Sequence, residues 1–210
     1  MYNIPYFKEQ DQQVVLNFMR EHSFAMLIGC SGNTPAATQL PLLMEEREGK
    51  LFLLGHFMRS TDHHKAFENN NEVLCVFTGP HAYVSASWYT QPQQASTWNY
   101  MTVHARGRMA FTNEDKLRDI LEQTTTHYGG ENTAGGYHQL PPHYIDKLIG
   151  AIVGFEIEVE SMEHVFKLSQ NRDAESYNNI IHHLQQGDAN AKGIAAEMQK
   201  RAAQLHKEKS

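Results

Sequence analysis

The order of hydrophobic and polar positions predicts short strands joined by turns along most of the chain. Apolar stretches of strand length, either continuous or alternating with polar residues, recur between turn signals. The six strands predicted in this way are residues 23–30, 36–44, 51–57, 72–78, 101–112 and 151–163. Strands of this length and spacing favour an antiparallel barrel.

Helical spacing of apolar residues predicts helices between and after these strands. Capping residues or prolines mark four helix starts, at Asp11, Thr61 or Asp62, Asn113, and Pro141-Pro142. Two further helices are expected at about 174–186 and 189–207. Residues 128–140 contain four glycines without periodicity and predict either a mobile lid or a plain connector. The expected fold class is therefore α+β and mainly β, a six-stranded antiparallel barrel decorated with helices.

The composition supports one substantial core and no general attraction to nucleic acid. Of the 210 residues, 40% are hydrophobic and 10% are aromatic, which is enough for a globular domain. The formal net charge of −6 gives no field that favours DNA, RNA or an anionic membrane. Only the last predicted helix is locally basic, and its charges are mixed. These charged residues are Lys192, Lys200, Arg201, Lys207 and Lys209, opposed by Glu197 and Glu208. Direct sequence-specific DNA binding is therefore poorly supported by the residues.

The cysteines and the N-terminal residues indicate a cytoplasmic protein. Cys30 and Cys75 each lie in an apolar, strand-like run and lack metal-ligand spacing, so we expect buried free thiols in a reducing compartment. The first residues lack the basic start and apolar core of a signal peptide. No apolar run approaches the roughly 18–20 residues that span a bilayer, so no membrane association is expected.

Residues 79–107 concentrate aromatic side chains beside small hydroxyl-bearing ones. The stretch holds both tryptophans of the chain, Trp88 and Trp98, together with three tyrosines and two histidines. Rigid amphipathic rings beside Ser, Thr and Asn are typical of a site that holds a flat ring and fixes its polar edge. An aromatic sheet core with internally satisfied hydroxyls has the same composition. Both interpretations stay open at this point.

Two polar segments carry groups that an anionic ligand needs. After the third predicted strand, Arg59, Ser60 and Thr61 supply a forked cation and hydroxyls beside a helix N-terminus, which suits a phosphate. After the sixth predicted strand, residues 167–172 read Lys-Leu-Ser-Gln-Asn-Arg. The alternatives are a solvated loop for the first segment and a solvated turn with a helix cap for the second.

The histidines do not predict a metal site. His64 and Glu68 have the i, i+4 spacing of a helical ligand pair, but no third ligand and no His-Glu-x-x-His or Cys-x-x-Cys motif accompanies them. We interpret this pair, and His182-His183, as surface residues. His81 and His104 lie within the aromatic stretch and are as consistent with function as with hydrogen-bonded core histidines.

Three segments resemble the signatures of one protein family. They read His-Ala-Tyr-Val-Ser-Ala-Ser-Trp-Tyr at 81–89, Thr-Trp-Asn-Tyr-Met-Thr-Val-His-Ala-Arg-Gly at 97–107, and Lys-Leu-Ser-Gln-Asn-Arg at 167–172. Together they resemble the FMN-binding, Pai-type negative transcriptional regulators, and the resemblance runs from the first residue to about residue 198. Ala86 and Ser96 stand where that family usually has proline.

The resemblance implies a split barrel related in fold to pyridoxamine-phosphate oxidases, with FMN as cofactor and a homodimer as the assembly. It places the flavin phosphate near Arg59, where Thr61-Asp62 replaces the usual Asn-Pro. It places Lys167 and Arg172 at the isoalloxazine edge, often in the partner subunit, where positive charge stabilises reduced flavin. The cofactor-binding residues predicted on this basis are His56, Arg59, Ser60, Thr61, Ser85, Ser87, Trp88, Tyr89, Trp98, Asn99, Lys167, Ser169, Gln170 and Arg172.

The function implied by the resemblance is that of an FMN-binding regulator with flavin at a dimer interface. One alternative is a flavin-dependent oxidoreductase acting on a small molecule, with His81, His104 or Tyr89 as acid or base and no assigned catalytic residue. A second alternative is a cofactor-free ligand-binding module. Residues 1–172 are expected to form the FMN-binding split-barrel domain, and residues 173–210 to form helices packed on the same domain.

Overall fold

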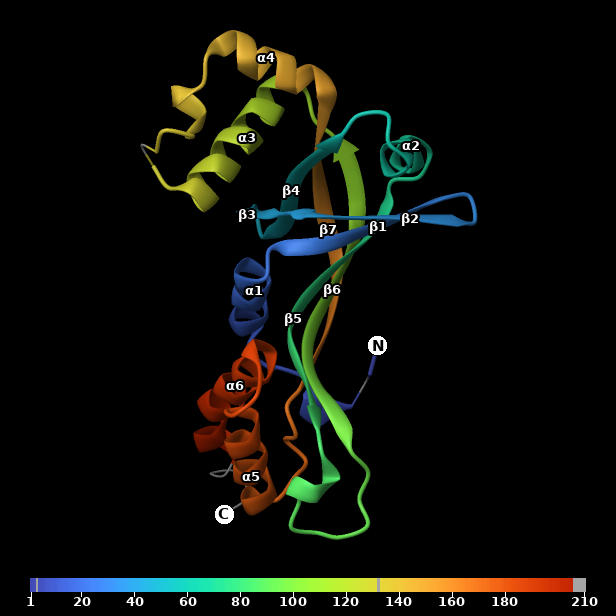
Figure 1. Cartoon of the computed structure of the whole chain (residues 1–210). Coiled ribbons are helices and arrows are strands. Elements are labelled where there is room, and N and C mark those ends of the chain that lie inside the picture. The colour runs from blue at the N-terminus through green and yellow to red at the C-terminus, as the bar shows by residue number, and fades with distance from the viewer. Residues whose placement is uncertain (3, 132, 206–210) are drawn as a thin grey trace. The chain divides into compact units, whose positions relative to one another are not determined.

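The computed structural model describes residues 1–2, 4–131 and 133–205, which form seven strands, six α-helices and three short 3-10 helices (Figure 1). The strands are β1 (Phe24–Ser31), β2 (Thr34–Pro41), β3 (Leu43–Arg47), β4 (Lys50–Met58), β5 (Glu72–Val84), β6 (Thr97–Phe111) and β7 (Ile152–Lys167). The α-helices are α1 (Gln12–Glu21), α2 (Asp62–Asn69), α3 (Glu114–Gly129), α4 (Pro142–Ala151), α5 (Ala174–Leu184) and α6 (Ala189–Leu205). The 3-10 helices are η1 (Pro5–Phe7), η2 (Ala86–Trp88) and η3 (Tyr137–Gln139).

All seven described strands belong to one sheet, in the order β2-β1-β5-β6-β7-β4-β3. The pairings β1–β2, β1–β5, β3–β4 and β4–β7 are antiparallel. In the β1–β2 pair, Phe24 lies opposite Pro41, and in the β4–β7 pair, Met58 lies opposite Ile152. The predicted α+β class and the antiparallel arrangement are confirmed.

The prediction of six strands is wrong, because the stretch expected as one strand at 36–44 forms two. β2 ends at Pro41 and β3 begins at Leu43, with the buried Leu42 between them. Proline has no N–H to continue a strand ladder, so the pairing breaks there. The N–H of Leu42 donates instead to the carbonyl of Ser23 at 2.9 Å. β2 then pairs with β1, whereas β3 pairs with β4.

The aromatic stretch lies largely on strands, which are longer than the hydrophobic pattern predicts. β5, β6 and β7 contain 13, 15 and 16 residues. β6 starts at Thr97 and places Asn99 and Met101 in the interior with Trp98 exposed. Threonine and tryptophan fit a pleated, half-buried surface well, so their mixed polarity does not end the strand.

By internal contacts the chain forms two compact units, each assembled from segments distant in the sequence. Unit 1 comprises the described residues of 1–18, 78–103 and 163–210. In its core, Phe18 and Phe166 have ring centroids 5.1 Å apart, and the buried Tyr177 donates its hydroxyl proton to the carbonyl of Met198 at 2.9 Å. Figure 1 shows α5 beside α6 in this unit, in agreement with their contacts.

Unit 2 comprises residues 19–77 and the described residues of 104–162. Its core contains a row of stacked rings, with Phe57 lying 5.1 Å from Phe155 and 6.2 Å from Phe67 between ring centroids. Cys75 is fully buried there, and this burial raises the pKa of its thiol to about 12. Both cysteines are free thiols, but Cys30 is only half-buried.

Most predicted helix starts are confirmed. The Asp11 carboxylate accepts the Gln13 N–H at 2.8 Å, and the Asn113 side-chain oxygen accepts the N–H of Lys116 at 2.9 Å. The predicted end of the last helix at 207 lies outside the described residues, as do Lys207, Glu208 and Lys209. None of the helices in the described part of the chain is both long and apolar enough to cross a bilayer.

Candidate functional site

The predicted cofactor residues fall into two groups, one in each unit. Unit 2 holds the group at and after the end of β4, namely His56, Arg59, Ser60 and Thr61. Unit 1 holds the group from the aromatic stretch and from the segment after β7. Its members are Ser85, Ser87, Trp88, Tyr89, Trp98, Asn99, Lys167, Ser169, Gln170 and Arg172.

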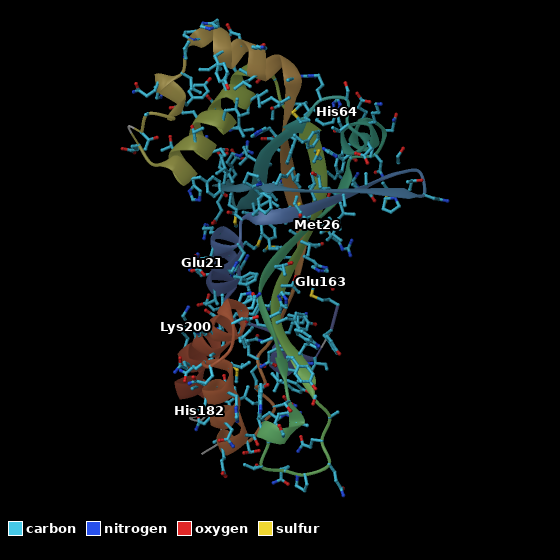
Figure 2. The ribbon with its side chains drawn as sticks, viewed as in Figure 1. Glu21, Met26, His64, Glu163, His182 and Lys200 are labelled. Atoms are coloured by element: carbon cyan, nitrogen blue, oxygen red, sulfur yellow. The ribbon has the colours of Figure 1, made fainter. Side chains whose placement is uncertain are left out.

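Residues 59–61 form a tight loop held by His64, which lies in the first turn of α2 and is labelled in Figure 2. Ser60 has a φ of 66°, a left-handed conformation that disfavours a residue with a side chain. Its N–H donates to Nδ1 of His64 at 3.0 Å. His64 is 8% exposed, and its ring centroid lies 5.9 Å from that of Phe57 and 5.3 Å from that of Phe111. Packing of the His64 ring against Phe57 and Phe111 therefore fixes the position of Nδ1, which in turn holds the 59–61 loop.

The side chains around the start of α2 leave part of this loop open to an anion. Thr61 precedes the helix, but its hydroxyl donates to the carbonyl of Met58 at 2.8 Å and does not cap α2. The Asp62 carboxylate is 85% exposed and accepts the His63 N–H at 2.8 Å, so it occupies one of the donors at the N-terminus of α2. The Ser60 hydroxyl has no hydrogen bond to another described residue. A helix N-terminus with such a hydroxyl favours bound phosphate.

Arg59 keeps most of its donors available. One Nη donates to the carbonyl of Ile152 at 2.7 Å, which leaves the other guanidinium N–H groups for a ligand. Arg59 borders a cavity of about 340 Å³ that Glu114 and Asp146 also line. Both carboxylates are bound by Arg118, at 2.6 and 2.8 Å, so their charge is already balanced.

His56 lies inside the sheet next to this loop. It sits on β4 opposite Gly154 of β7. Burial lowers the pKa of its imidazole, which keeps the ring neutral at pH 7. His56 can therefore donate or accept a hydrogen bond but supplies no positive charge.

In unit 1, Lys167, Arg172 and Tyr89 form what we call the cation cluster. The Arg172 guanidinium carbon lies 4.0 Å above the centre of the Tyr89 ring. Nζ of Lys167 donates to Oγ1 of Thr97 at 2.5 Å and lies 5.6 Å from the centre of the Tyr2 ring. Burial, and then the positive charge of Arg172, lowers the pKa of Lys167. Neither cation forms an ion pair with a carboxylate of the described residues.

Ser169, Gln170 and Asn99 hold the turn that presents Arg172. Ser169 is buried with a φ of 62°, and its hydroxyl donates to Oδ1 of Asn99 at 3.1 Å. Asn99 is fully buried and donates to the sulfur of Met198 at 3.6 Å. The Arg172 N–H donates to the Ser169 carbonyl at 3.0 Å, and the Gln170 side chain bonds two backbone groups of the same turn. All three side chains thus form hydrogen bonds within the chain.

The Tyr89 hydroxyl is a buried polar group without a hydrogen-bond partner among the described residues. The residue itself is 9% exposed. A buried hydroxyl left unpaired costs about 1–3 kcal/mol. A ligand atom placed against this hydroxyl would remove that cost.

Ser85 and Ser87 are used within the chain. The Ser85 hydroxyl accepts the Ser87 N–H at 3.3 Å and lies 2.8 Å from the Ser87 hydroxyl. Nearby, the Ser96 hydroxyl accepts the N–H of Ala86 at 2.9 Å. Ala86 and Ser96, which stand where the family usually has proline, are therefore joined by a hydrogen bond that two prolines could not form.

Trp88 and Trp98 line a separate cavity of about 460 Å³ in unit 1. Trp88 stacks on His183 of α5, with centroids 4.8 Å apart and planes 10° apart. Trp98 and Asn99 are neighbours on β6 and face opposite sides of the strand, with 53% and 0% exposure. The tryptophans thus share one cavity, which Tyr89 and Asn99 do not line.

Sequence reasoning misplaced His64 and missed Thr97. The interpretation of His64 as a surface residue is wrong, because it is buried on the same helix face as Phe67, three residues later. That spacing is a signal that was available in the sequence. Nothing in the pattern predicts that Thr97 accepts a hydrogen bond from Lys167, since 70 residues separate them.

Comparisons with known proteins agree with the sequence signatures. Residues 1–161 match the sequence model of a family described as "Putative FMN-binding domain". The chain is 34% identical over 204 residues to the protease synthase and sporulation protein PAI 2 of Bacillus subtilis, covering 95% of this chain and 97% of that protein.

Solved structures with TM-scores above 0.5 share the fold. The FAD and heme binding protein from Mycobacterium smegmatis has a TM-score of 0.56 at 13% identity, over 76% of this chain and 72% of that one. The flavocytochrome Anf3 from Azotobacter vinelandii has a TM-score of 0.53 at 14% identity, over 79% of this chain and 72% of that one. The family match covers most of the sequence and the Bacillus relative covers nearly all of it, and the chain therefore belongs to the Pai-like family described as "Putative FMN-binding domain".

Proposed function

We propose that this protein binds FMN, with the phosphate at the 59–61 loop and the edge of the isoalloxazine ring at the cation cluster. Family membership supports the choice of cofactor. When bound, FMN would supply reversible electron transfer. The chain's own residues would bind the two ends of the cofactor and orient it.

The observation that carries this function is the unbalanced charge of the cation cluster. Lys167 and Arg172 lie close enough for one to lower the pKa of the other, and neither is paired with a described carboxylate. Beside them, the Tyr89 hydroxyl is buried and unpaired. An electron-rich ring edge with carbonyl and nitrogen acceptors would balance the positive charge and would accept a hydrogen bond from the Tyr89 hydroxyl.

The 59–61 loop suits the phosphate end for independent reasons. It combines the N-terminus of α2, the Ser60 hydroxyl and the remaining guanidinium donors of Arg59. Hydrogen bonds from a guanidinium or from backbone N–H groups to an ionised phosphate are stronger than hydrogen bonds between two neutral groups. The Asp62 carboxylate accepts the His63 N–H but is 85% exposed, so a bound phosphate would have to displace it from that donor.

In a homodimer, as the family resemblance implies, the two groups that hold one FMN would come from different copies. The exposed apolar side chains of β1 support a contact with a second copy, since Phe24 is 65% exposed and Met26 is 38% exposed (Figure 2 labels Met26).

A mixture of Arg59→Ala and Arg172→Ala chains tests whether one FMN site is shared between two copies. Each mixed dimer would regain one intact site, so FMN binding should return on mixing. If each FMN site belonged to one chain, mixing would restore nothing.

A regulatory role is the second part of the function we propose. The name of the Bacillus subtilis relative, a protease synthase and sporulation protein, supports it. The net charge of −6 favours an indirect effect through a metabolite or redox signal over direct DNA contact. A specific gel shift by the pure protein at physiological salt would contradict the indirect mechanism.

The experiment that tests FMN binding is the visible absorbance of the purified protein, before and after addition of FMN. We expect flavin bands that follow the protein through gel filtration and weaken in Arg59→Ala and Arg172→Ala. Glu175→Ala, which changes an exposed charge in the first turn of α5, is the matched control and should leave the bands unchanged. A colourless protein that does not bind added FMN would contradict the proposal and favour the alternative of a cofactor-free binding module.

A further inference from the structure

The cavity that Trp88 and Trp98 line has the chemistry of a binding site of its own. Its volume is about 460 Å³, and it lies between the start of β6, the end of β5, η2 and the turn that joins α5 to α6. All of these segments belong to unit 1. The proposed FMN contacts of the cation cluster and of the 59–61 loop are not among its lining residues. We call it the aromatic cavity.

Aromatic side chains line the aromatic cavity on two sides. On the strand side, Trp98 is 53% exposed, and its ring centroid lies 5.9 Å from that of Tyr83 and 6.1 Å from that of His81. On the helix side, Trp88 and His183 are stacked 4.8 Å apart. Large aromatic residues exposed together at a concave surface are unusual unless something covers them.

The one formally charged lining residue at pH 7 is Asp188, with the histidines counted as neutral. Its Oδ1 accepts the Ala191 N–H at 2.8 Å and so caps α6, and Oδ2 makes no hydrogen bond to a described residue. The C-terminal end of α5 and the N-terminal end of α6 both border the cavity, so their opposite partial charges offset each other. The net field in the cavity is that of a carboxylate.

We propose that the aromatic cavity binds a small organic cation of the quaternary or alkylated ammonium class. Ring faces attract cations through the ring quadrupole, and a nearby carboxylate adds direct attraction. An alkylated ammonium is weakly hydrated and has an apolar surface, so it loses little on entering a partly open aromatic cavity. Asp188 would repel an anion, including the phosphate of FMN, and a neutral ring would gain nothing from it.

The test uses the intrinsic fluorescence of the full-length protein, because both tryptophans of the chain line the aromatic cavity. Choline is the probe, and 3,3-dimethylbutan-1-ol, which has the same shape without the charge, is the matched control ligand. We expect choline to change the emission saturably, with a dissociation constant of about millimolar, and the neutral isostere to bind at least about fivefold more weakly.

Variants at two positions test the two sources of attraction separately. Asp188→Asn keeps a residue that caps helices equally well and removes only the charge, and it should weaken choline binding about two- to fivefold. Trp98→Leu should weaken it by a similar factor, whereas Trp98→Phe should keep most of the affinity. Choline titrations of the Trp98 variants are repeated by calorimetry, because these variants lack one of the two tryptophans. Unchanged thermal unfolding shows that the variants fold.

Three results would overturn the assignment of an organic cation. The first is equal binding of choline and its neutral isostere, which would make the cavity a simple apolar site. The second is unchanged choline affinity in Asp188→Asn. The third is fluorescence quenching by FMN that competes with choline and disappears in Trp98→Leu, which would return the tryptophans to the flavin site.

Discussion

At the residue scale, the site depends on two serines held in left-handed conformations. Ser60 and Ser169 have φ values of 66° and 62°, and each lies in a turn that carries a proposed ligand-binding arginine. Strain of this kind persists only where neighbouring groups hold it. The sequence names Arg59 and Arg172 as candidate ligand-binding residues, and their binding roles stay predictions. It could not predict the side chains that hold their turns, because those contacts depend on packing.

We expect His64→Gln to weaken both folding and FMN binding. Glutamine places its amide where Nε2 lies and so leaves the Ser60 N–H without its acceptor, at a cost of about 1 kcal/mol. Asparagine places its oxygen near Nδ1 and should keep that hydrogen bond. Urea unfolding and FMN titration of both variants measure the effect. Equal losses in His64→Asn and His64→Gln would show that ring packing alone matters.

Replacement of Arg172 by Gln should raise the pKa of Lys167. Burial is the main cause that lowers this pKa, and the positive charge of Arg172 is the second, so removing the charge reverses only the second effect. The pKa follows from the side-chain NMR signals of Lys167 over an alkaline titration. Arg20→Gln, which removes a distant exposed cation, is the control. An unchanged Lys167 pKa in Arg172→Gln would show that the two residues do not interact and would contradict the cation cluster.

At the scale of elements, the sequence predicted the helices and strands well where local signals decide. Asp11 and Asn113 cap helices as expected, because capping needs only a side-chain oxygen near the first turn. The break at Pro41 was missed because the apolar run continues through it. The two faces of β6 were also missed, since the direction in which Trp98 and Asn99 point depends on strand register.

The cap of α5 predicts a pH dependence of stability. The Ser176 N–H, followed by the Ser176 hydroxyl, lowers the pKa of Asp173. A carboxyl whose folded pKa is depressed stabilises the protein above its unfolded pKa, about 3.9, and this contribution is lost as the pH falls through the folded pKa. Asn also caps helices, so Asp173→Asn should flatten the decline in stability below about pH 4, whereas Asp173→Ala should cost about 1 kcal/mol at pH 7.

Urea unfolding between pH 2.5 and 7 measures these differences. The wild-type protein and Asp173→Asn should converge at the acid end of the range. Parallel stability curves for the two proteins would show that the charge of Asp173 contributes nothing through α5.

At the scale of the whole molecule, the predicted class was right and the distribution of the site was not foreseeable. The predicted residues of the three family signatures all lie in unit 1, whereas His56 and residues 59–61, outside the signatures, lie in unit 2, and both units are built from interleaved segments. A one-dimensional pattern contains no information on which distant segments pack together. For the same reason, whether the charges of the cation cluster and of Arg59 are balanced could be assessed only from their three-dimensional neighbours.

The most direct measurement of the central claim compares the affinities of FMN and riboflavin, which differ by the phosphate alone. We predict that the wild-type protein binds FMN at least about tenfold more tightly, because charge-assisted hydrogen bonds contribute about 1.5–3 kcal/mol. Arg59→Ala should lower FMN affinity towards that of riboflavin and leave riboflavin binding unchanged. Equal affinity of the wild-type protein for both flavins, or equal losses of both in Arg59→Ala, would contradict the account.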